Sequence, residues 1–211
     1  MEYNENPRFG KHPSKILQEV FSERPFQIQE PEKAKIIFLG LDANLDKNIE
    51  QNELFFNEMI GYFRDGINYW KSNRIHTPML KDTYKGGGKR YHKQFCKLGF
   101  SSKNAEDICF LELLNICTYG RTTENINIFM DMLNASENKE HLNRIRKIFK
   151  MENIICISKG VKRIVEGLGF NSIGKNIIYH THFSGSISND EIKGIKTKLW
   201  EYIKMVYGGT A

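Results

Sequence analysis

The chain has 211 residues, 40% of them hydrophobic and 27% charged, with a formal net charge of +6. This composition is typical of a globular domain and excludes a disordered chain, and no apolar run approaches the ~20 residues of a membrane-spanning helix. The N-terminal segment Met1–Asn6 is polar and acidic, unlike a secretory signal. The four cysteines show no CxxC pair and no zinc spacing, so we expect reduced thiols in a cytoplasmic protein.

Strand-like and helix-like segments alternate along the chain. Short apolar runs predict strands at 34–39, 108–114, 153–157 and 176–179. Apolar residues at helical spacing predict helices at 14–21, within 50–71, and at 91–98, 126–133, 141–150, 161–168 and 189–207. The alternation predicts an α/β fold: a single three-layer domain, residues 31–211, whose mostly parallel central β-sheet is flanked by helices. Residues 1–30 are expected to form an N-terminal extension with one helix.

Three of the predicted strands run into polar residues of catalytic type. Asp42 follows the first strand, Asn115 ends the second apolar run, and His182 follows the last strand. Ligands of parallel α/β sheets bind just beyond the carboxyl ends of the strands. We therefore expect these three side chains to meet in one cleft, although they are far apart in the sequence.

Each of these residues also has a purely structural explanation. An aspartate after a strand often caps the next helix, and an asparagine at a strand end often forms a turn. His180 and His182 point to the same side of an extended chain, as metal ligands do, but the sequence offers no further His or Cys cluster to complete a coordination sphere. We expect no metal and no cofactor. Glu112, inside the second apolar run, needs a partner, for which a lysine or arginine of a neighbouring element is the candidate.

The three motifs resemble, in their order and approximate spacing, those of the uracil-DNA glycosylase superfamily. That family has a G-Q-D-P-type motif after its first core strand, L-L-N after a middle strand and an H-P-S-type motif after its last. The matching segments here are Gly40-Leu41-Asp42-Ala43-Asn44, Leu113-Leu114-Asn115 and His182-Phe183-Ser184-Gly185. Ala43 and Phe183 replace the two prolines of the family motifs.

The resemblance implies a DNA glycosylase that hydrolyses the N-glycosidic bond of uracil or a related damaged base after flipping it from the DNA. It places the water-activating or cation-stabilising carboxylate at Asp42, and at His182 the group that stabilises negative charge on the departing base. It assigns base recognition to Asn115. Contacts to the substrate are expected from Gly40, Leu41, Asn44, Ser184 and Gly185, and Phe63 or Tyr69 is the candidate to stack on the base. The implied protein is a monomer with DNA as its partner and no membrane association.

Two other functions remain open at this stage. A non-catalytic protein of the same fold would bind DNA or a nucleobase without cleaving it. An unrelated α/β hydrolase would use Asp42 and His182 on a small molecule. The net charge of +6 suits a polyanionic partner, but it is equally that of a soluble protein rich in lysine.

Overall fold

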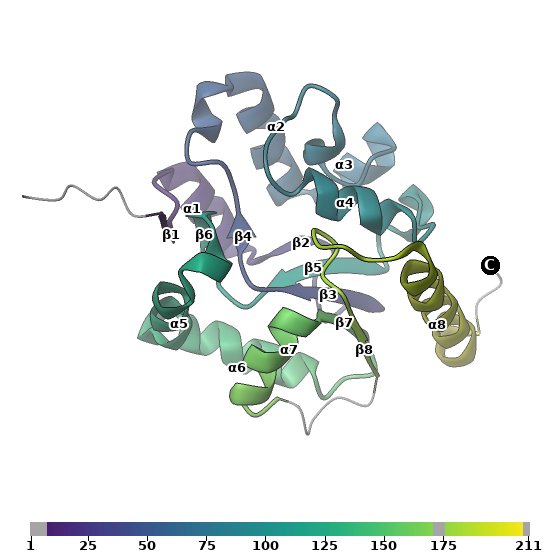
Figure 1. Ribbon diagram of the computed structural model, residues 1–211. Helices are drawn as coiled ribbons and strands as arrows, with labels where there is room; N and C mark the ends of the chain where they lie inside the picture. Colours follow the sequence, from purple (N-terminus) through teal and green to yellow (C-terminus); the bar gives the residue numbers. More distant parts are fainter. Residues whose placement is uncertain (1–7, 171–175, 209–211) are drawn as a thin grey trace, which may run out of the picture.

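The computed structural model describes residues 8–170 and 176–208 and shows an α/β fold (Figure 1). The segment Met1–Asn6, considered above, lies outside the described residues. The main sheet has the strand order β2-β5-β3-β7-β8. Strands β5, β3, β7 and β8 run parallel, and β2 pairs antiparallel with β5. Their bounds are β2 Phe26–Ile28, β3 Ile36–Gly40, β5 Ile108–Glu112, β7 Ile154–Ser158 and β8 Ile177–His180.

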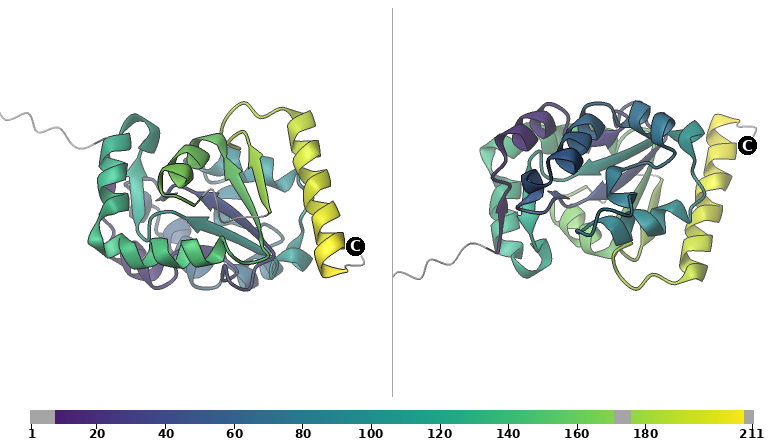
Figure 2. Two further views of the ribbon diagram at one scale, coloured as in Figure 1. Left: turned by 90° about the horizontal axis from the view of Figure 1, so that it is seen from below. Right: turned by 90° about the horizontal axis from the view of Figure 1, so that it is seen from above.

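Alternating side chains of the central strand β3 belong to two separate hydrophobic cores. Ile36 and Phe38 pack in one core, and Ile37 and Leu39 in the other, because successive residues of a strand face opposite sides of the sheet. Helices therefore cover both faces (Figure 2). The first core contains residues of α1 Lys15–Glu23, α2 Glu53–Arg64, α3 Gly66–Asn73, α4 Lys89–Cys96 and α8 Asn189–Tyr207. The second contains residues of α5 Ile126–Asn134, α6 Lys139–Ile148 and α7 Lys159–Gly167.

A second, smaller sheet lies next to the carboxyl end of β3. It has the order β1-β6-β4, with bounds β1 Phe9–Lys11, β4 Ala43–Asn44 and β6 Cys117–Gly120. Only Leu41 and Asp42 separate β3 from β4, so the chain passes directly from the main sheet into the small one. Asp42 consequently lies at the junction of the two sheets, because β3 before it pairs with β5 and β4 after it pairs with β6.

The structure confirms an α/β fold and differs from the sequence-based expectation in its strands. The short strands β1, β2, β4 and β6 were not predicted. Two of them, together with α1, come from residues 1–30, which were expected to form an extension. The strand predicted at 108–114 ends at Glu112. Short 3-10 helices complete the described elements: η1 Ile49–Gln51, η2 Pro78–Leu80, η3 Ser102–Asn104, η4 Thr122–Glu124 and η5 Ser136–Asn138.

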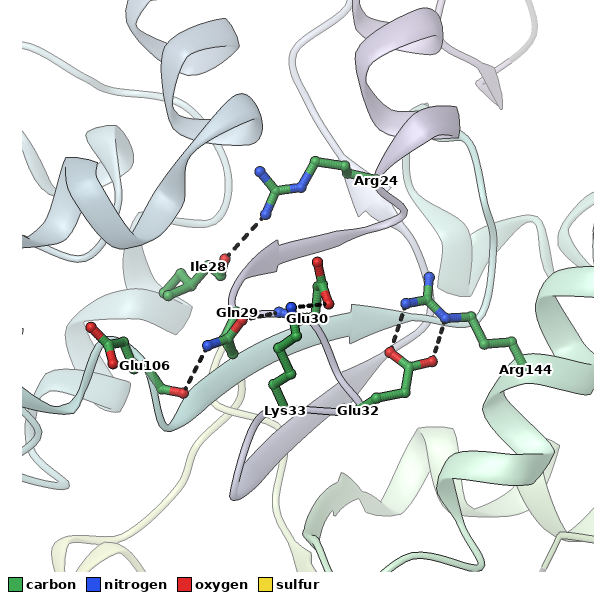
Figure 3. A network of polar contacts seen from close by, with 8 residues as sticks. All are labelled: Arg24, Ile28, Gln29, Glu30, Glu32, Lys33, Glu106 and Arg144. Atoms are coloured by element: carbon green, nitrogen blue, oxygen red, sulfur yellow. Dashed lines mark hydrogen bonds and ion pairs between the residues drawn. The ribbon is translucent and has the colours of Figure 1, made fainter.

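Polar side chains connect the segment between β2 and β3 to α6 and to the start of β5 (Figure 3). Arg144 of α6 donates two hydrogen bonds of 2.7 Å to the Glu32 carboxylate, and Gln29 donates to the carbonyl of Glu106, just before β5. Exposed ion pairs of this kind contribute at most about 1 kcal/mol each. Glu32 and Glu106 directly precede β3 and β5, at the amino ends of these parallel strands, whereas Asp42 follows the carboxyl end of β3.

Candidate active-site pocket

A pocket of about 390 Å³ lies at the carboxyl ends of the parallel strands. It is lined by residues from segments far apart in the chain, including Gln27 of β2, Tyr91 of α4 and Ser158 of β7. Among the residues expected to form the site, it brings together Gly40, Leu41, Asp42, Asn44, His182 and Ser184. The expected convergence of Asp42 and His182 on one pocket therefore agrees with the geometry.

The Asp42 carboxylate is held in place by three side-chain donors. Thr122 donates to Oδ1 at 2.9 Å and to Oδ2 at 3.0 Å, and Thr118 and Asn44 also donate to Oδ2. Burial raises the pKa of Asp42, and the hydrogen bonds from Thr118, Thr122 and Asn44 act against that rise because they stabilise the ionised form. Since Asn44 also donates to Thr118 at 3.2 Å, its amide positions Asp42.

His182 presents a neutral imidazole to the pocket. The backbone N–H of Ser184 donates to Nδ1 at 3.2 Å, so the proton of the neutral ring is on Nε2. Burial, with a smaller effect from neighbouring His180, lowers the pKa of His182. Nε2–H is thus a hydrogen-bond donor that needs no prior protonation.

The neighbouring His180 is arranged differently. Its Nδ1 lies 2.8 Å from the carbonyl oxygen of Thr181, and its ring stacks on Phe183 with centroids 4.5 Å apart. Phe183, which replaces a proline of the family motif, is fully buried. Within the described part of the chain, no group of three or more His, Cys, Asp or Glu side chains has the arrangement of a metal site.

Glu112, the last residue of β5, lines the pocket and pairs with Gly40, the last residue of β3. Its carboxyl group accepts a hydrogen bond from Gln27 Nε2 at 3.4 Å, and the Tyr62 hydroxyl donates to Gln27 Oε1 at 3.1 Å. The partner of Glu112 is therefore an amide, and among the described residues no lysine or arginine forms an ion pair with it. Burial, and to a smaller extent the charge of Asp42, raises the pKa of Glu112 well above its ordinary value. Sequence reasoning noted this carboxylate but assigned it no function.

The structure does not bring Asn115 into the pocket. Because β5 ends at Glu112, the strand end beside Gly40 holds Glu112, and Asn115 follows three residues later. The Asn115 amide donates to the carbonyl of Glu137 at 3.1 Å, on the side of η5. Gly185 is also absent from the described lining of the pocket, and its carbonyl accepts a hydrogen bond from Arg90 at 3.0 Å.

Aromatic side chains form much of the remaining wall. Phe63 of α2, Phe110 of β5 and Tyr91 of α4 line the pocket, and the Tyr91 ring lies 5.4 Å from that of His182. Tyr69, the other candidate for stacking, instead donates a hydrogen bond to Glu58 at 2.7 Å and is not part of the described lining. The sequence predicted the helix that begins near Tyr91 but contained no signal that its first turn faces the site.

A pair of buried histidines lies behind this wall. His76 Nε2 and His92 Nδ1 are 2.8 Å apart, and His92 lines the pocket. Burial lowers the pKa of His92 to about 3 and that of His76 well below its ordinary value, with the charge of His92 adding to the effect on His76. Both rings are therefore neutral at physiological pH.

Comparison of the chain with protein-family models, with curated proteins and with solved structures gave no match. Across residues 8–170 and 176–208, none of the helices combines the length and the apolar character needed to cross a lipid bilayer. The function is accordingly inferred from the pocket and from the motif order.

Proposed function

We propose that this protein is a metal-independent DNA glycosylase that hydrolyses the N-glycosidic bond of uracil or a related damaged base. The observation that carries the proposal is that Asp42 and His182, which lie in the first and last of the three motifs, line the same pocket. The parallel strands β5, β3, β7 and β8, with helices on both faces, support a three-layer domain like that of the uracil-DNA glycosylase superfamily. DNA is the proposed partner of a monomeric, cytoplasmic enzyme.

The two polar groups complement the charges that develop during cleavage. Breaking the bond between the sugar and the base leaves an oxocarbenium-like sugar and an anionic base. A carboxylate fixed by Thr118, Thr122 and Asn44 stabilises the cationic sugar and orients the attacking water. The Nε2–H of neutral His182 donates a hydrogen bond to the anionic base oxygen.

The pocket is also large enough for the proposed substrate. A volume of about 390 Å³ accommodates a single nucleobase, and the rings of Tyr91, Phe63 and Phe110 offer apolar surface against it. A base inside a duplex cannot reach such a pocket, so it has to leave the stack first, which costs a few kcal/mol.

The proposal is tested with oligonucleotides that each contain uracil, hypoxanthine, xanthine or a T·G mismatch, with alkali treatment to cleave the abasic sites. For the wild type we expect excision of at least one of these bases. Asp42→Asn keeps the shape of the side chain and removes its charge, so it should reduce the single-turnover rate by about 100-fold or more, while oligonucleotide binding is largely kept.

Asp131→Asn is the matched control, because Asp131 is exposed on α5 and outside the described lining of the pocket. It should excise the base at the wild-type rate. A wild-type protein that binds these oligonucleotides and cleaves none would contradict the glycosylase proposal and favour a non-catalytic nucleobase-binding protein.

A further inference from the structure

The lining of the pocket contains a second carboxyl group, that of Glu112, whose surroundings differ from those of Asp42. Glu112 has one hydrogen-bonded oxygen, Oε1, which accepts from Gln27. Among the described residues, none forms a hydrogen bond with Oε2. Glu112 is half-buried and lines the pocket, so its second oxygen is placed to form a hydrogen bond with a bound ligand.

The neighbouring residues are arranged around this carboxyl group. Gly40 pairs with Glu112 across β3 and β5, and a methyl group at position 40 would overlap Oε2. The backbone of β3 can approach the carboxyl group only because residue 40 has no side chain. On the other side, Tyr62 donates to Gln27 Oε1, and this turns the Gln27 NH₂ group toward Glu112. Gln27 and the backbone at Gly40 thus lie on either side of the Glu112 carboxyl group.

We propose that Glu112, held by Gln27 and Gly40, recognises the base: it donates a hydrogen bond through Oε2 and accepts one through Oε1. This inference rests on the proposed function and names the chemical class of its substrate. A carboxylic acid pairs with a base edge on which a hydrogen-bond acceptor stands beside a donor. The O4 and N3–H of uracil form such an edge, and so do the O6 and N1–H of hypoxanthine.

The environment favours the protonated acid over the carboxylate. Asp42, a second carboxyl group at the same end of the sheet, is stabilised in its charged form by three donors, whereas Glu112 has one long contact to a neutral amide. Two neighbouring carboxyl groups in a site share the charge unequally, and the one with fewer donors keeps the proton. The raised pKa of Glu112 agrees with this assignment.

Two variants separate hydrogen bonding from charge. Glu112→Gln presents an NH₂ donor and an oxygen acceptor in the shape of the neutral acid, whereas Glu112→Met fills the space with neither. The ligands are 1-methyluracil, in which the methyl group replaces the sugar, and 1,3-dimethyluracil, in which the N3–H donor is blocked. Binding is followed by NMR titration, and thermal unfolding confirms that each variant is folded.

We expect wild type and Glu112→Gln to bind 1-methyluracil at least about 10-fold more tightly than 1,3-dimethyluracil, which corresponds to the loss of one hydrogen bond to a buried group. Glu112→Met should bind both ligands equally weakly. The proposal is overturned if wild type does not bind 1-methyluracil, if it binds both ligands equally, or if Glu112→Gln loses the preference as Glu112→Met does.

The oligonucleotide assay distinguishes failure of this inference from failure of the proposed function. Excision of uracil by wild type, combined with an unchanged ligand preference in Glu112→Met, would leave the glycosylase proposal intact and remove Glu112 from base recognition. The expected ligand preference without any excision would keep Glu112 in its role and contradict the glycosylase activity.

Discussion

At the scale of single residues, the pocket contains two carboxyl groups that differ in the number of hydrogen-bond donors around them. Asp42 accepts hydrogen bonds from Thr118, Thr122 and Asn44, and Glu112 accepts one from Gln27. Pairs of titratable groups whose surroundings push their pKa values apart are typical of sites that need an acid and a base together. The difference between Asp42 and Glu112 should therefore be measurable in the stability of the protein as well as in its activity.

The pH dependence of stability tests the protonation of Glu112. Because its folded pKa is raised above the ordinary value of 4.5, the native state holds a proton that the unfolded chain releases between these two pKa values. In that range Glu112 destabilises the protein by up to about 1.4 kcal/mol for each unit of rising pH. Glutamine does not titrate, so the stability of Glu112→Gln relative to wild type should increase as the pH rises from 4.5 toward the raised pKa of Glu112.

Chemical denaturation of both proteins across this pH range provides the measurement. The titratable groups that interact with the charge of Glu112 include Asp42, and also Tyr62, Tyr91, Cys109 and Cys117, whose pKa values are raised by burial so that they stay neutral in this range. The His141 ring lies with its Nε2 2.8 Å from the backbone carbonyl oxygen of Glu112. Burial lowers the pKa of His141, so it stays neutral over the upper part of this range. Glu140→Gln, at an exposed position of α6, is the control and should show no such trend. A constant difference between wild type and Glu112→Gln would contradict a raised pKa.

At the scale of elements, the small sheet supports the site from outside the main sheet. Thr118, which donates to Asp42, belongs to β6, and β6 pairs with β1 from the start of the described chain. Phe9 of β1 is 1% exposed and packs in the second core. The N-terminal strand is therefore part of the framework that positions Asp42.

Phe9→Ala should lower the free energy of unfolding by about 3 to 5 kcal/mol, the usual cost of removing a buried phenylalanine side chain, and it should reduce excision as well. Urea denaturation provides the measurement. Leu54→Ala is the control, because Leu54 is 87% exposed, and it should change the stability by less than about 0.5 kcal/mol. Equal stabilities of Phe9→Ala and wild type would show that β1 is not needed to hold the small sheet.

The long elements could be predicted from the sequence, whereas the short strands could not. The predicted helix at 141–150 corresponds to α6, because apolar residues such as Ile145 and Ile148 repeat at helical spacing. The unpredicted strands β1, β2, β4 and β6 have two to four residues and contain no continuous apolar run, whereas β8, which also has four residues, coincides with the run predicted at 176–179. Asn115 was expected at a strand end for a related reason: Leu113 and Leu114 are buried like strand residues, so the apolar run continues past the end of β5.

The same limit applies to the candidate site. Asp42 and His182 were found because they directly follow strands, and the carboxyl ends of parallel strands meet at one edge. Other lining residues come from elements that do not end at this edge: Tyr91 and His92 from α4, and Gln27 from the antiparallel strand β2. The position of these elements relative to the pocket depends on tertiary packing. Local sequence patterns contain no information about such packing.

At the scale of the whole molecule, the net charge of +6 and the pocket make separate contributions to nucleic-acid binding. Arg121 lines the pocket with an exposed side chain, which forms an ion pair of 2.7 Å with the exposed Glu124. Phosphate contacts of such groups release counterions from the nucleic acid, whereas hydrogen bonds between Glu112 and a base do not. The two contributions should therefore respond differently to salt.

The affinity of the Asp42→Asn variant for a single-stranded uracil oligonucleotide should fall as salt increases, with a slope of log K against log salt near −0.7 for each phosphate contacted. The affinity for 1-methyluracil should stay constant over the same range. Fluorescence anisotropy and NMR titration measure the two affinities. An oligonucleotide affinity that is independent of salt would argue against a phosphate-binding surface and for a small-molecule substrate.

The residues that line the pocket range along the chain from Gln27 to Ser184. A partly folded intermediate that lacks either β2 or the loop after β8 therefore has no complete binding cavity. The time at which ligand binding recovers during refolding from denaturant would therefore report when β2 and β8, the two outermost strands of the main sheet, have both docked.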